Sequence, residues 1–482
     1  MTSALLTDFY ELTMMQGYFL ANHNPKVVFD MFYRTNPFLG GYTIFTGLEE
    51  VIDAFENFGF SKEDIEYLKS LNTFDEKFIN FLADYTFKGD IYAITEGTPT
   101  FPGEPLVRVE TTLIDAQLIE GFLLNTLNFQ TLIATKANRM CNAIKGHGAI
   151  MEFGLRRAQG IDGANSASRA SFIGGTAVTS NTYAGKKYNI PVSGTMAHSW
   201  IMSFDSEEEA FRKFAKIYPD NAVLLIDTFY TLGTGIEAAI KIGLEQKAIG
   251  KKIGVRIDSG DLSYLPKVIR NRLNEAGLED ASICVSNDLT EDILQTLVSD
   301  NVPIDSWGIG THLVTGGTQA SLNGVYKLSA KEENGVFVPV MKFSNSFEKT
   351  TNPGIKQVYR FFDVTGAPQG DLIALEGEEI MPECNYTFYH PFSLGDFFVM
   401  KKSKYCRIEP LLKLQMKEGK RVNKKRELRE IQAYSKEAFA AFDQSYKRII
   451  NPHIYKVSLS EKLKTLKVNL TLTVKKQEEE LM

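Results

Sequence analysis

The chain has 482 residues, of which 44% are hydrophobic and 23% charged, as in a globular protein large enough for two or three domains. Its net charge of −6 argues against wholesale binding of nucleic acid. The four cysteines form no Cys-x-x-Cys pair, no signal peptide is evident, and no apolar run approaches the ~20 residues of a membrane span. We therefore expect a cytoplasmic protein with no membrane contact that handles a diffusible substrate.

The first 146 residues predict a mixed α/β domain. Residues 87–110 alternate apolar and polar side chains between glycines and prolines, which predicts short antiparallel strands. Elsewhere apolar residues recur at spacings of three and four, which predicts a helix at the start of residues 1–35 and helices in residues 48–72, 75–85 and 112–146.

Residues 147–330 show a different pattern, in which eight short apolar runs recur, mostly with helical stretches between them. The runs are Ala149–Phe153, Ala170–Ile173, Pro191–Ser193, Ala222–Ile226, Ile253–Ile257, Ser282–Val285, Ser306–Ile309 and Val325–Leu328. Strands that alternate with helices predict parallel βαβ units, and eight units suggest an α/β barrel with irregular, loop-rich first connections. Because the carboxyl ends of barrel strands build the active site, we expect the site in this domain.

This alternation fades in residues 331–482. We expect mixed strands and turns in residues 336–378 and helices in residues 404–456, all packing on the first domain. The predicted fold class is α/β, with an irregular α/β barrel and a mixed α/β N-terminal domain completed by C-terminal segments.

One stretch, residues 152–200, contains several residues that could bind or react with a ligand. Arg156 and Arg157 follow a predicted strand end; adjacent guanidinium groups suit phosphate oxygens, although such a pair can also be merely solvated. Gly174 and Gly175 would let the backbone approach a ligand closely. His198 follows small residues that leave its imidazole accessible, and it could act as a base, a ligand or a nucleophile.

Further candidates lie at later strand ends. Asp227 could orient the imidazole by accepting its second N–H, or it could cap a helix. Arg256 and Asp258 point to one face of a strand, either as a simple ion pair or as groups for an anionic substrate and for ribose hydroxyls or Mg²⁺. Gly316 and Gly317 follow the seventh run, where barrels often bind phosphate.

These motifs together resemble those of one family. TDFYELTMMQGYF, EFGLRRAQG, FIGGT, GTMAHS, IDTFYT, GVRIDSGDL and GIGTHLVTGG occur in this order along almost the whole chain. They are similar to the motifs of the nicotinate phosphoribosyltransferases, in the type II phosphoribosyltransferase superfamily. The resemblance implies that nicotinate reacts with 5-phosphoribosyl 1-pyrophosphate to give nicotinate mononucleotide and pyrophosphate, in NAD salvage. It also implies ATP hydrolysis through a phosphohistidine, and a head-to-tail homodimer with active sites at the subunit boundary.

The resemblance also assigns roles to individual residues. His198 would be the phosphorylated histidine, with Asp227 near it and Asp258 near the ribose. The substrate contacts would be Tyr10 donated across the dimer, Phe153 against the pyridine ring, Arg156 and Arg157 at the phosphates, Arg256 near the base, and Gly316 and Gly317 at the 5′-phosphate. The departing pyrophosphate calls for arginines and Mg²⁺, but no side chain is assigned to a metal.

Thr176 bears on the choice of base. Related enzymes that use nicotinamide have an aspartate at the end of an FxGxD motif, where FIGGT ends in threonine. An aspartate would repel a carboxylate substrate, so its absence favours nicotinate. The alternative is a nicotinamide or quinolinate phosphoribosyltransferase on the same fold. An unrelated barrel enzyme would carry a Schiff-base lysine or clustered metal ligands, and a non-catalytic sensor would bind phosphoribosyl pyrophosphate without releasing pyrophosphate.

Overall fold

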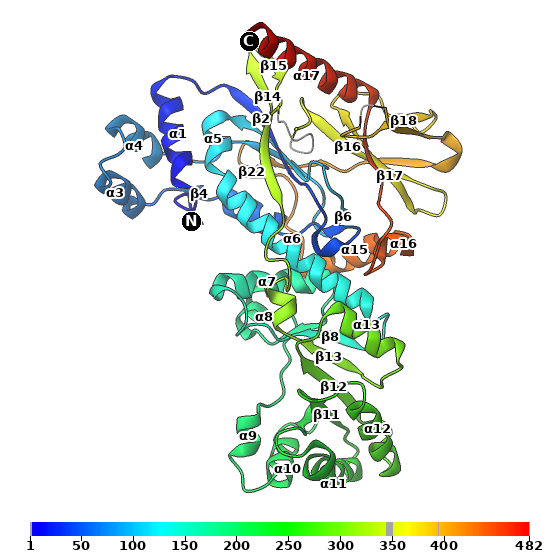
Figure 1. Ribbon diagram of the computed structural model, residues 1–482. Helices are drawn as coiled ribbons and strands as arrows, with labels where there is room; N and C mark the ends of the chain where they lie inside the picture. Colours follow the sequence, from blue (N-terminus) through cyan, green and yellow to red (C-terminus); the bar gives the residue numbers. More distant parts are fainter. Residues whose placement is uncertain (1, 344–349, 394, 482) are drawn as a thin grey trace. The chain divides into compact units, whose positions relative to one another are not determined.

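The computed structural model describes residues 2–343, 350–393 and 395–481. The chain folds into two compact units, shown in Figure 1. Unit 1 comprises Met1–Leu132 together with Ser321–Met482, and unit 2 comprises Ile133–Ala320. The boundaries expected from the sequence, after residues 146 and 330, enclose a similar middle segment.

The N-terminal part of unit 1 contains four short helices, of which the first and the last pack through aromatic side chains. They are α1 (Phe9–Leu20), α2 (Leu48–Phe55), α3 (Lys62–Ser70) and α4 (Glu76–Ala83). The ring of Phe19 on α1 lies 5.7 Å from that of Phe78 and 5.0 Å from that of Phe81, both on α4. The hydroxyl of Ser61 starts α3 by accepting a hydrogen bond from the backbone N–H of Asp64. The helices expected in residues 48–72 and 75–85 are confirmed.

Unit 1 has a seven-stranded sheet of order β15-β14-β2-β7-β5-β21-β22, antiparallel throughout. Its strands are β2 (Lys26–Tyr33), β5 (Asp90–Ala93), β7 (Val107–Thr112), β14 (Gly324–Glu333), β15 (Val336–Pro339), β21 (Lys413–Lys417) and β22 (Lys420–Arg421). The strands expected within residues 87–110 are confirmed. The helical pattern expected at the start of residues 1–35 is confirmed by α1. β2, which follows in the same segment, was not predicted, because a continuous buried apolar run does not distinguish a strand from a helix.

A second sheet of unit 1 has the order β19-β18-β23-β17-β16-β20. Its strands are β16 (Lys356–Phe362), β17 (Pro368–Leu375), β18 (Tyr386–Tyr389), β19 (Phe397–Met400), β20 (Arg407–Pro410) and β23 (Val457–Leu459). Helix α17 (Glu461–Leu481) contacts β17 and β18.

The helices expected in residues 404–456 are only partly confirmed. The segment ends in α15 (Leu428–Ala440) and α16 (Gln444–Lys447), but its first part forms β20, β21 and β22. Runs of only two to five residues between turns carry too little periodicity to reveal these strands.

Unit 2 is built on a parallel sheet of order β10-β11-β12-β13-β8-β9, which curls into a half-barrel. Its strands are β8 (Ala149–Glu152), β9 (Val178–Thr179), β10 (Ala222–Leu225), β11 (Ile253–Ile257), β12 (Ser282–Asn287) and β13 (Ser306–Ile309). Figure 1 shows these strands flanked by α11 (Ile236–Ala248), α12 (Leu265–Glu275) and α13 (Glu291–Ser299). The expected irregular α/β barrel is confirmed in this open form.

Three of the eight expected barrel strands are wrong. Ala170–Ile173 lies in helix α7 (Gly160–Gly174), since a short buried run looks the same in a helix and a strand. Pro191–Ser193 contributes only an isolated bridge from Val192 to Thr179. Val325–Leu328 belongs to β14, which pairs with β2 in unit 1.

The remaining elements are short, except for α6. They are α5 (Leu113–Leu118), α6 (Glu120–Ala143), α8 (Thr182–Tyr188), α9 (His198–Met202), α10 (Glu207–Ile217), α14 (Thr311–Val314), a π-helical turn at Thr231–Gly235, 3₁₀ turns at Pro37–Leu39 and Lys402–Lys404, β1 (Thr2–Ser3), β3 (Thr43–Ile44), β4 (Phe58–Gly59) and β6 (Pro99–Thr100). Within the part of the chain that the structure describes, none of the helices has the length and apolar character needed to cross a bilayer.

Candidate active site

Polar side chains gather at the carboxyl edge of the half-barrel in unit 2. Asp227 follows β10, Asp258 follows β11, and Phe153 follows β8. Because β10 and β11, and β8 and β13, are parallel neighbours, their carboxyl ends lie at one edge of the sheet. Residues separated by more than 100 positions in the sequence therefore share one rim.

Arg256 is the centre of this cluster. Its Nε donates to Ser286 Oγ at 2.9 Å, its Nη1 to Thr195 Oγ1 at 3.0 Å, and its Nη2 to Asp258 Oδ1 at 3.0 Å. Its guanidinium carbon lies 5.9 Å from the centre of the Phe153 ring. The ion pair and the aromatic contact fix a planar cation beside an aromatic face.

Asp258 is held in its ionised form. Burial raises the pKa of this carboxyl, but hydrogen bonds from Ser286 and Arg256 outweigh burial and lower the pKa below its usual value. Ser286 donates to the same oxygen, Oδ1, that Arg256 contacts. The other oxygen, Oδ2, lies 4.0 Å from Nε2 of His198.

His198 is open to solvent and is tied through one ring nitrogen. Its side chain is 42% exposed, and its Nδ1 lies 3.1 Å from the hydroxyl of Thr228. The sequence suggested Asp227 for this role. Instead, Oδ2 of Asp227 accepts hydrogen bonds from the backbone N–H of Asp258 at 2.8 Å and from Ser259 Oγ at 2.7 Å.

Phe153 sits where glycine leaves room for its ring. Its backbone N–H donates to Ile309 O at 2.8 Å, which continues the pairing of β8 with β13. A Cβ at Gly308 on β13 would lie 2.7 Å from the Phe153 ring, so the ring occupies the space that glycine leaves. The sequence analysis assigned no role to Gly308, Ser286, Thr195 or Thr228. Thr195, Thr228 and Gly308 nevertheless lie within the motifs GTMAHS, IDTFYT and GIGTHLVTGG, which was the available signal.

The arginine pair lies on an exposed turn after β8. Arg156 and Arg157 are both exposed, and the N–H of Arg157 donates to Gly154 O at 2.8 Å. Glu152, 1% exposed, accepts a hydrogen bond from the backbone N–H of Gly154. The turn is thus anchored by a buried carboxylate, while both arginines are exposed to solvent, where an anion can reach them.

The FIGGT segment is packed rather than open. A Cβ at Gly174 would lie 2.4 Å from Ala134 O, so this glycine permits close contact between α7 and α6 instead of approach to a ligand. Thr176, the last residue of the motif, is 1% exposed. The ligand approach expected at Gly174 is therefore wrong.

Two further expected site features are a glycine pair that follows α14 and a tyrosine on α1. Gly316 and Gly317 follow α14 in unit 2 with φ values of +75° and +62°, a conformation that favours glycine. Tyr10 lies on α1 in unit 1, where its hydroxyl donates to Glu11 Oε1 at 3.3 Å. Burial, followed by the charges of Glu120 and Glu11, raises the pKa of Tyr10 to about 12.

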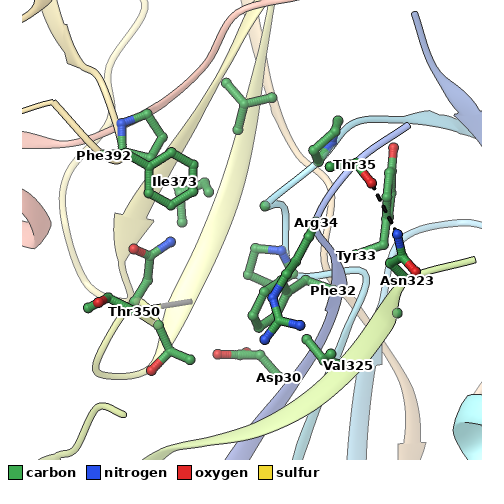
Figure 2. Close-up of a pocket in the computed structure, with 18 of the residues that line it drawn as sticks. Asp30, Phe32, Tyr33, Arg34, Thr35, Asn323, Val325, Thr350, Ile373 and Phe392 are labelled. Atoms are coloured by element: carbon green, nitrogen blue, oxygen red, sulfur yellow. Dashed lines mark hydrogen bonds between the residues drawn. The ribbon is translucent and has the colours of Figure 1, made fainter. Parts of the chain in front are cut away.

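Unit 1 also contains a cavity of about 610 Å³, shown in Figure 2. Asp30, Arg34, Thr350 and Phe392 are among its lining residues, and the ammonium of Lys356 pairs with Asp30 at 2.8 Å. These residues differ from those of the half-barrel rim, and the sequence analysis did not single them out.

The carboxylates of the rim offer a partial metal site. Among residues 2–343, 350–393 and 395–481, no group of three or more His, Cys, Asp or Glu side chains could hold a metal ion. Asp227 Oδ1 is buried and has no hydrogen-bond partner in the described structure, and it neighbours the ionised Asp258. Two carboxylates fit an Mg²⁺ ion that takes its remaining ligands from substrate phosphates and water.

A cluster of cation, carboxylates and imidazole at the carboxyl edge of a parallel half-barrel defines an α/β-barrel enzyme. Residues 5–128, 149–364 and 355–467 match, respectively, the N-terminal domain, the family and the C-terminal domain of nicotinate phosphoribosyltransferase. These matches cover most of the chain, and it belongs to the nicotinate phosphoribosyltransferase family.

Individual relatives agree with this family. The chain is 40% identical to nicotinate phosphoribosyltransferase of Bacillus subtilis, over 99% of this chain and 97% of that protein. It is 35% identical to nicotinate phosphoribosyltransferase of Caenorhabditis elegans, over 95% of this chain and 92% of that protein. The crystal structure of human nicotinic acid phosphoribosyltransferase superposes with a TM-score of 0.84 at 27% identity, covering 96% of this chain and 99% of that one.

Proposed function

We propose that this enzyme joins nicotinate to 5-phosphoribosyl 1-pyrophosphate, giving nicotinate mononucleotide and pyrophosphate in NAD salvage. Family membership supports this reaction. The assignment of the site rests on one observation: the guanidinium of Arg256 lies beside the Phe153 ring and is hydrogen-bonded to Asp258. The carboxylate of Asp258 lies 4.0 Å from His198. A site that binds a planar aromatic acid must offer an aromatic face for the ring and a cation for the carboxylate.

Nicotinate would stack on Phe153 with its carboxylate directed to the guanidinium of Arg256. FIGGT ends in the neutral Thr176, where an aspartate would repel a carboxylate substrate, and this favours nicotinate. Asp258, which is ionised, would accept hydrogen bonds from ribose hydroxyls.

The reaction is a displacement at the anomeric carbon. The pyridine nitrogen forms the new C–N bond with its lone pair, the C–O bond to pyrophosphate breaks, and pyrophosphate leaves with both bonding electrons. Because this nitrogen is unprotonated at neutral pH, no general base is needed. Arg156 and Arg157 neutralise charge on the departing group. When bound, Mg²⁺ supplies further neutralisation, and Asp227 and Asp258 are the carboxylates suited to hold it.

His198 is then free to couple the reaction to ATP. If Thr228 Oγ1 accepts the Nδ1–H, Nε2 carries the lone pair on an imidazole that is partly exposed to solvent. Nε2 forms a bond to the γ-phosphorus of ATP, the bond to the β–γ bridging oxygen breaks, and ADP leaves. Later attack by water on the phosphohistidine returns the free imidazole and phosphate.

The enzyme acts in the cytoplasm as a homodimer in which Tyr10 of one subunit completes the site of the other. Tyr10→Ala and His198→Asn subunits, each inactive alone, should regain activity when unfolded together and refolded as a mixture, because one site per heterodimer is intact. A mixture that stays inactive, although heterodimers form, would exclude a shared site.

The choice of base is tested by turnover. Purified enzyme with phosphoribosyl pyrophosphate, ATP and Mg²⁺ should release pyrophosphate with nicotinate, and much more slowly with nicotinamide or quinolinate. If the enzyme turned over nicotinamide or quinolinate faster than nicotinate, that base would be its substrate and the proposal of nicotinate would be wrong. Binding of phosphoribosyl pyrophosphate without turnover of any base would indicate a sensor.

A further inference from the structure

Unit 2 contains a second cluster of charged side chains that the proposed mechanism does not use. The ammonium of Lys136 pairs with Glu291 Oε2 at 2.6 Å, and Nε of Arg139 pairs with Glu291 Oε1 at 3.1 Å. Lys136 and Arg139 lie on α6, and Glu291 is the first residue of α13. All three are buried, with exposed fractions of 5%, 3% and 6%.

Within this cluster, two positive charges share one negative charge. Burial raises the pKa of Glu291, but the nearby Lys136 and Arg139 outweigh burial and lower it, so the carboxylate is ionised. Placing charge in the interior is costly unless it is paired. Lys136 and Arg139 thus bring two cations to one buried position beside Glu291.

The cluster lies directly against the Gly316–Gly317 loop. The position that a Cβ of residue 317 would take is 3.5 Å from Nζ of Lys136 and 3.3 Å from Nδ1 of His312. Because residue 317 is glycine, that position is not filled by its own side chain. The ammonium of Lys136 and the imidazole of His312 therefore both lie beside the backbone of this loop, where no side chain of residue 317 separates them from an approaching phosphate.

We infer that Lys136 is a phosphate-binding residue, which holds the 5′-phosphate of the phosphoribosyl substrate at the Gly316–Gly317 loop. Glu291 and Arg139 act as positioning residues, since Glu291 fixes the ammonium of Lys136 and Arg139 holds Glu291. The inference rests on the proposed function only for the identity of the anion. The shared chemistry is a sugar phosphomonoester, which a cation and a glycine loop recognise through its oxygens.

A purely structural role is the competing explanation, and two ligands separate it from phosphate binding. Ribose 5-phosphate carries the 5′-phosphate alone, and pyrophosphate reports the other end of the substrate. Lys136→Met keeps the Arg139–Glu291 pair, so the fold should survive. Lys136→Arg keeps the charge. Lys213→Met, which breaks an exposed pair with Glu209 in the same unit, is the matched control.

The dissociation constants of both ligands are measured by calorimetry on the full-length variants. Lys136→Met should weaken ribose 5-phosphate roughly 10- to 100-fold, the loss expected for one charge-assisted hydrogen bond, and leave pyrophosphate within about twofold. Lys136→Arg should restore most of the affinity, and Lys213→Met should match wild type. The KM for phosphoribosyl pyrophosphate should rise in Lys136→Met while the KM for nicotinate is unchanged.

Unchanged affinity of Lys136→Met for ribose 5-phosphate would overturn the inference, as would an equal loss of both ligands. If Lys136→Met does not fold, Lys136→Arg and Glu291→Gln decide instead: Glu291→Gln should weaken ribose 5-phosphate more than pyrophosphate, and equal effects would contradict the inference. Failure of the proposed function is distinguishable, because the wild type would then bind ribose 5-phosphate but turn over none of the three bases.

Discussion

At the scale of single residues, the reactivity of His198 depends on which ring nitrogen is held. The sequence left three roles open for this histidine, because its neighbours across the rim are 30 and 60 positions away. The structure pairs Nδ1 with Thr228 and leaves the imidazole 42% exposed. A hydroxyl that accepts from Nδ1 favours the tautomer in which Nε2 can attack phosphorus.

Replacing Thr228 should therefore slow phosphorylation of His198. We expect Thr228→Val to reduce the rate of acid-labile labelling from γ-labelled ATP about tenfold, the effect of losing one hydrogen bond worth ~1.4 kcal/mol. Thr228→Ser should restore it, and His198→Asn should remove the label. Wild-type labelling rates in Thr228→Val would contradict the role of the hydroxyl, and label retained in His198→Asn would exclude the phosphohistidine.

At the scale of secondary-structure elements, Glu152 ties the arginine turn to the half-barrel. Its carboxylate accepts hydrogen bonds from the backbone of Gly154 after β8, from Ser168 on α7 at 2.8 Å, and from Thr179 on β9 at 2.5 Å. One buried acceptor thus fixes three elements around the turn that carries Arg156. The sequence placed Glu152 beside the motif but gave no sign of these partners.

Removal of this carboxylate should affect stability and substrate binding together. We expect Glu152→Ala to lower the free energy of unfolding by about 2 kcal/mol or more, because buried donors lose their acceptor. We also expect a higher KM for phosphoribosyl pyrophosphate. Glu152→Gln, which keeps one acceptor oxygen, should lose less in both. An unfolding midpoint of Glu152→Ala in urea equal to that of wild type would contradict this account.

Local patterns predicted some elements and not others for physical reasons. β8, β10, β11, β12 and β13 were predictable because each is an apolar run followed by polar residues. Ala170–Ile173 was misread because four buried residues fit one turn of α7 as well as a strand. β14 fits a strand in either unit, and only its pairing with β2 decides its sheet.

At the scale of the whole molecule, the sequence indicated the fold class and the chemistry of the rim but not its connections. Arg256 and Asp258 were predictable as a pair because side chains two positions apart at a strand end point to the same face, and they form an ion pair at the end of β11. Ser286 and Thr195, which hold Arg256, come from other segments, and no local pattern around them indicates this contact. Such long-range partners depend on strand order, which periodicity does not encode.

The central claim is that Arg256 and Phe153 bind the pyridine ring and the carboxylate of nicotinate. The most direct test is the selectivity of Arg256→Gln between nicotinate and nicotinamide. Steady-state kcat/KM is measured with nicotinate and with nicotinamide, for wild type and variant. We expect the variant to lose at least ~10-fold in kcat/KM for nicotinate and much less for nicotinamide, because only nicotinate loses a charge partner. An unchanged ratio of the two bases would contradict the account.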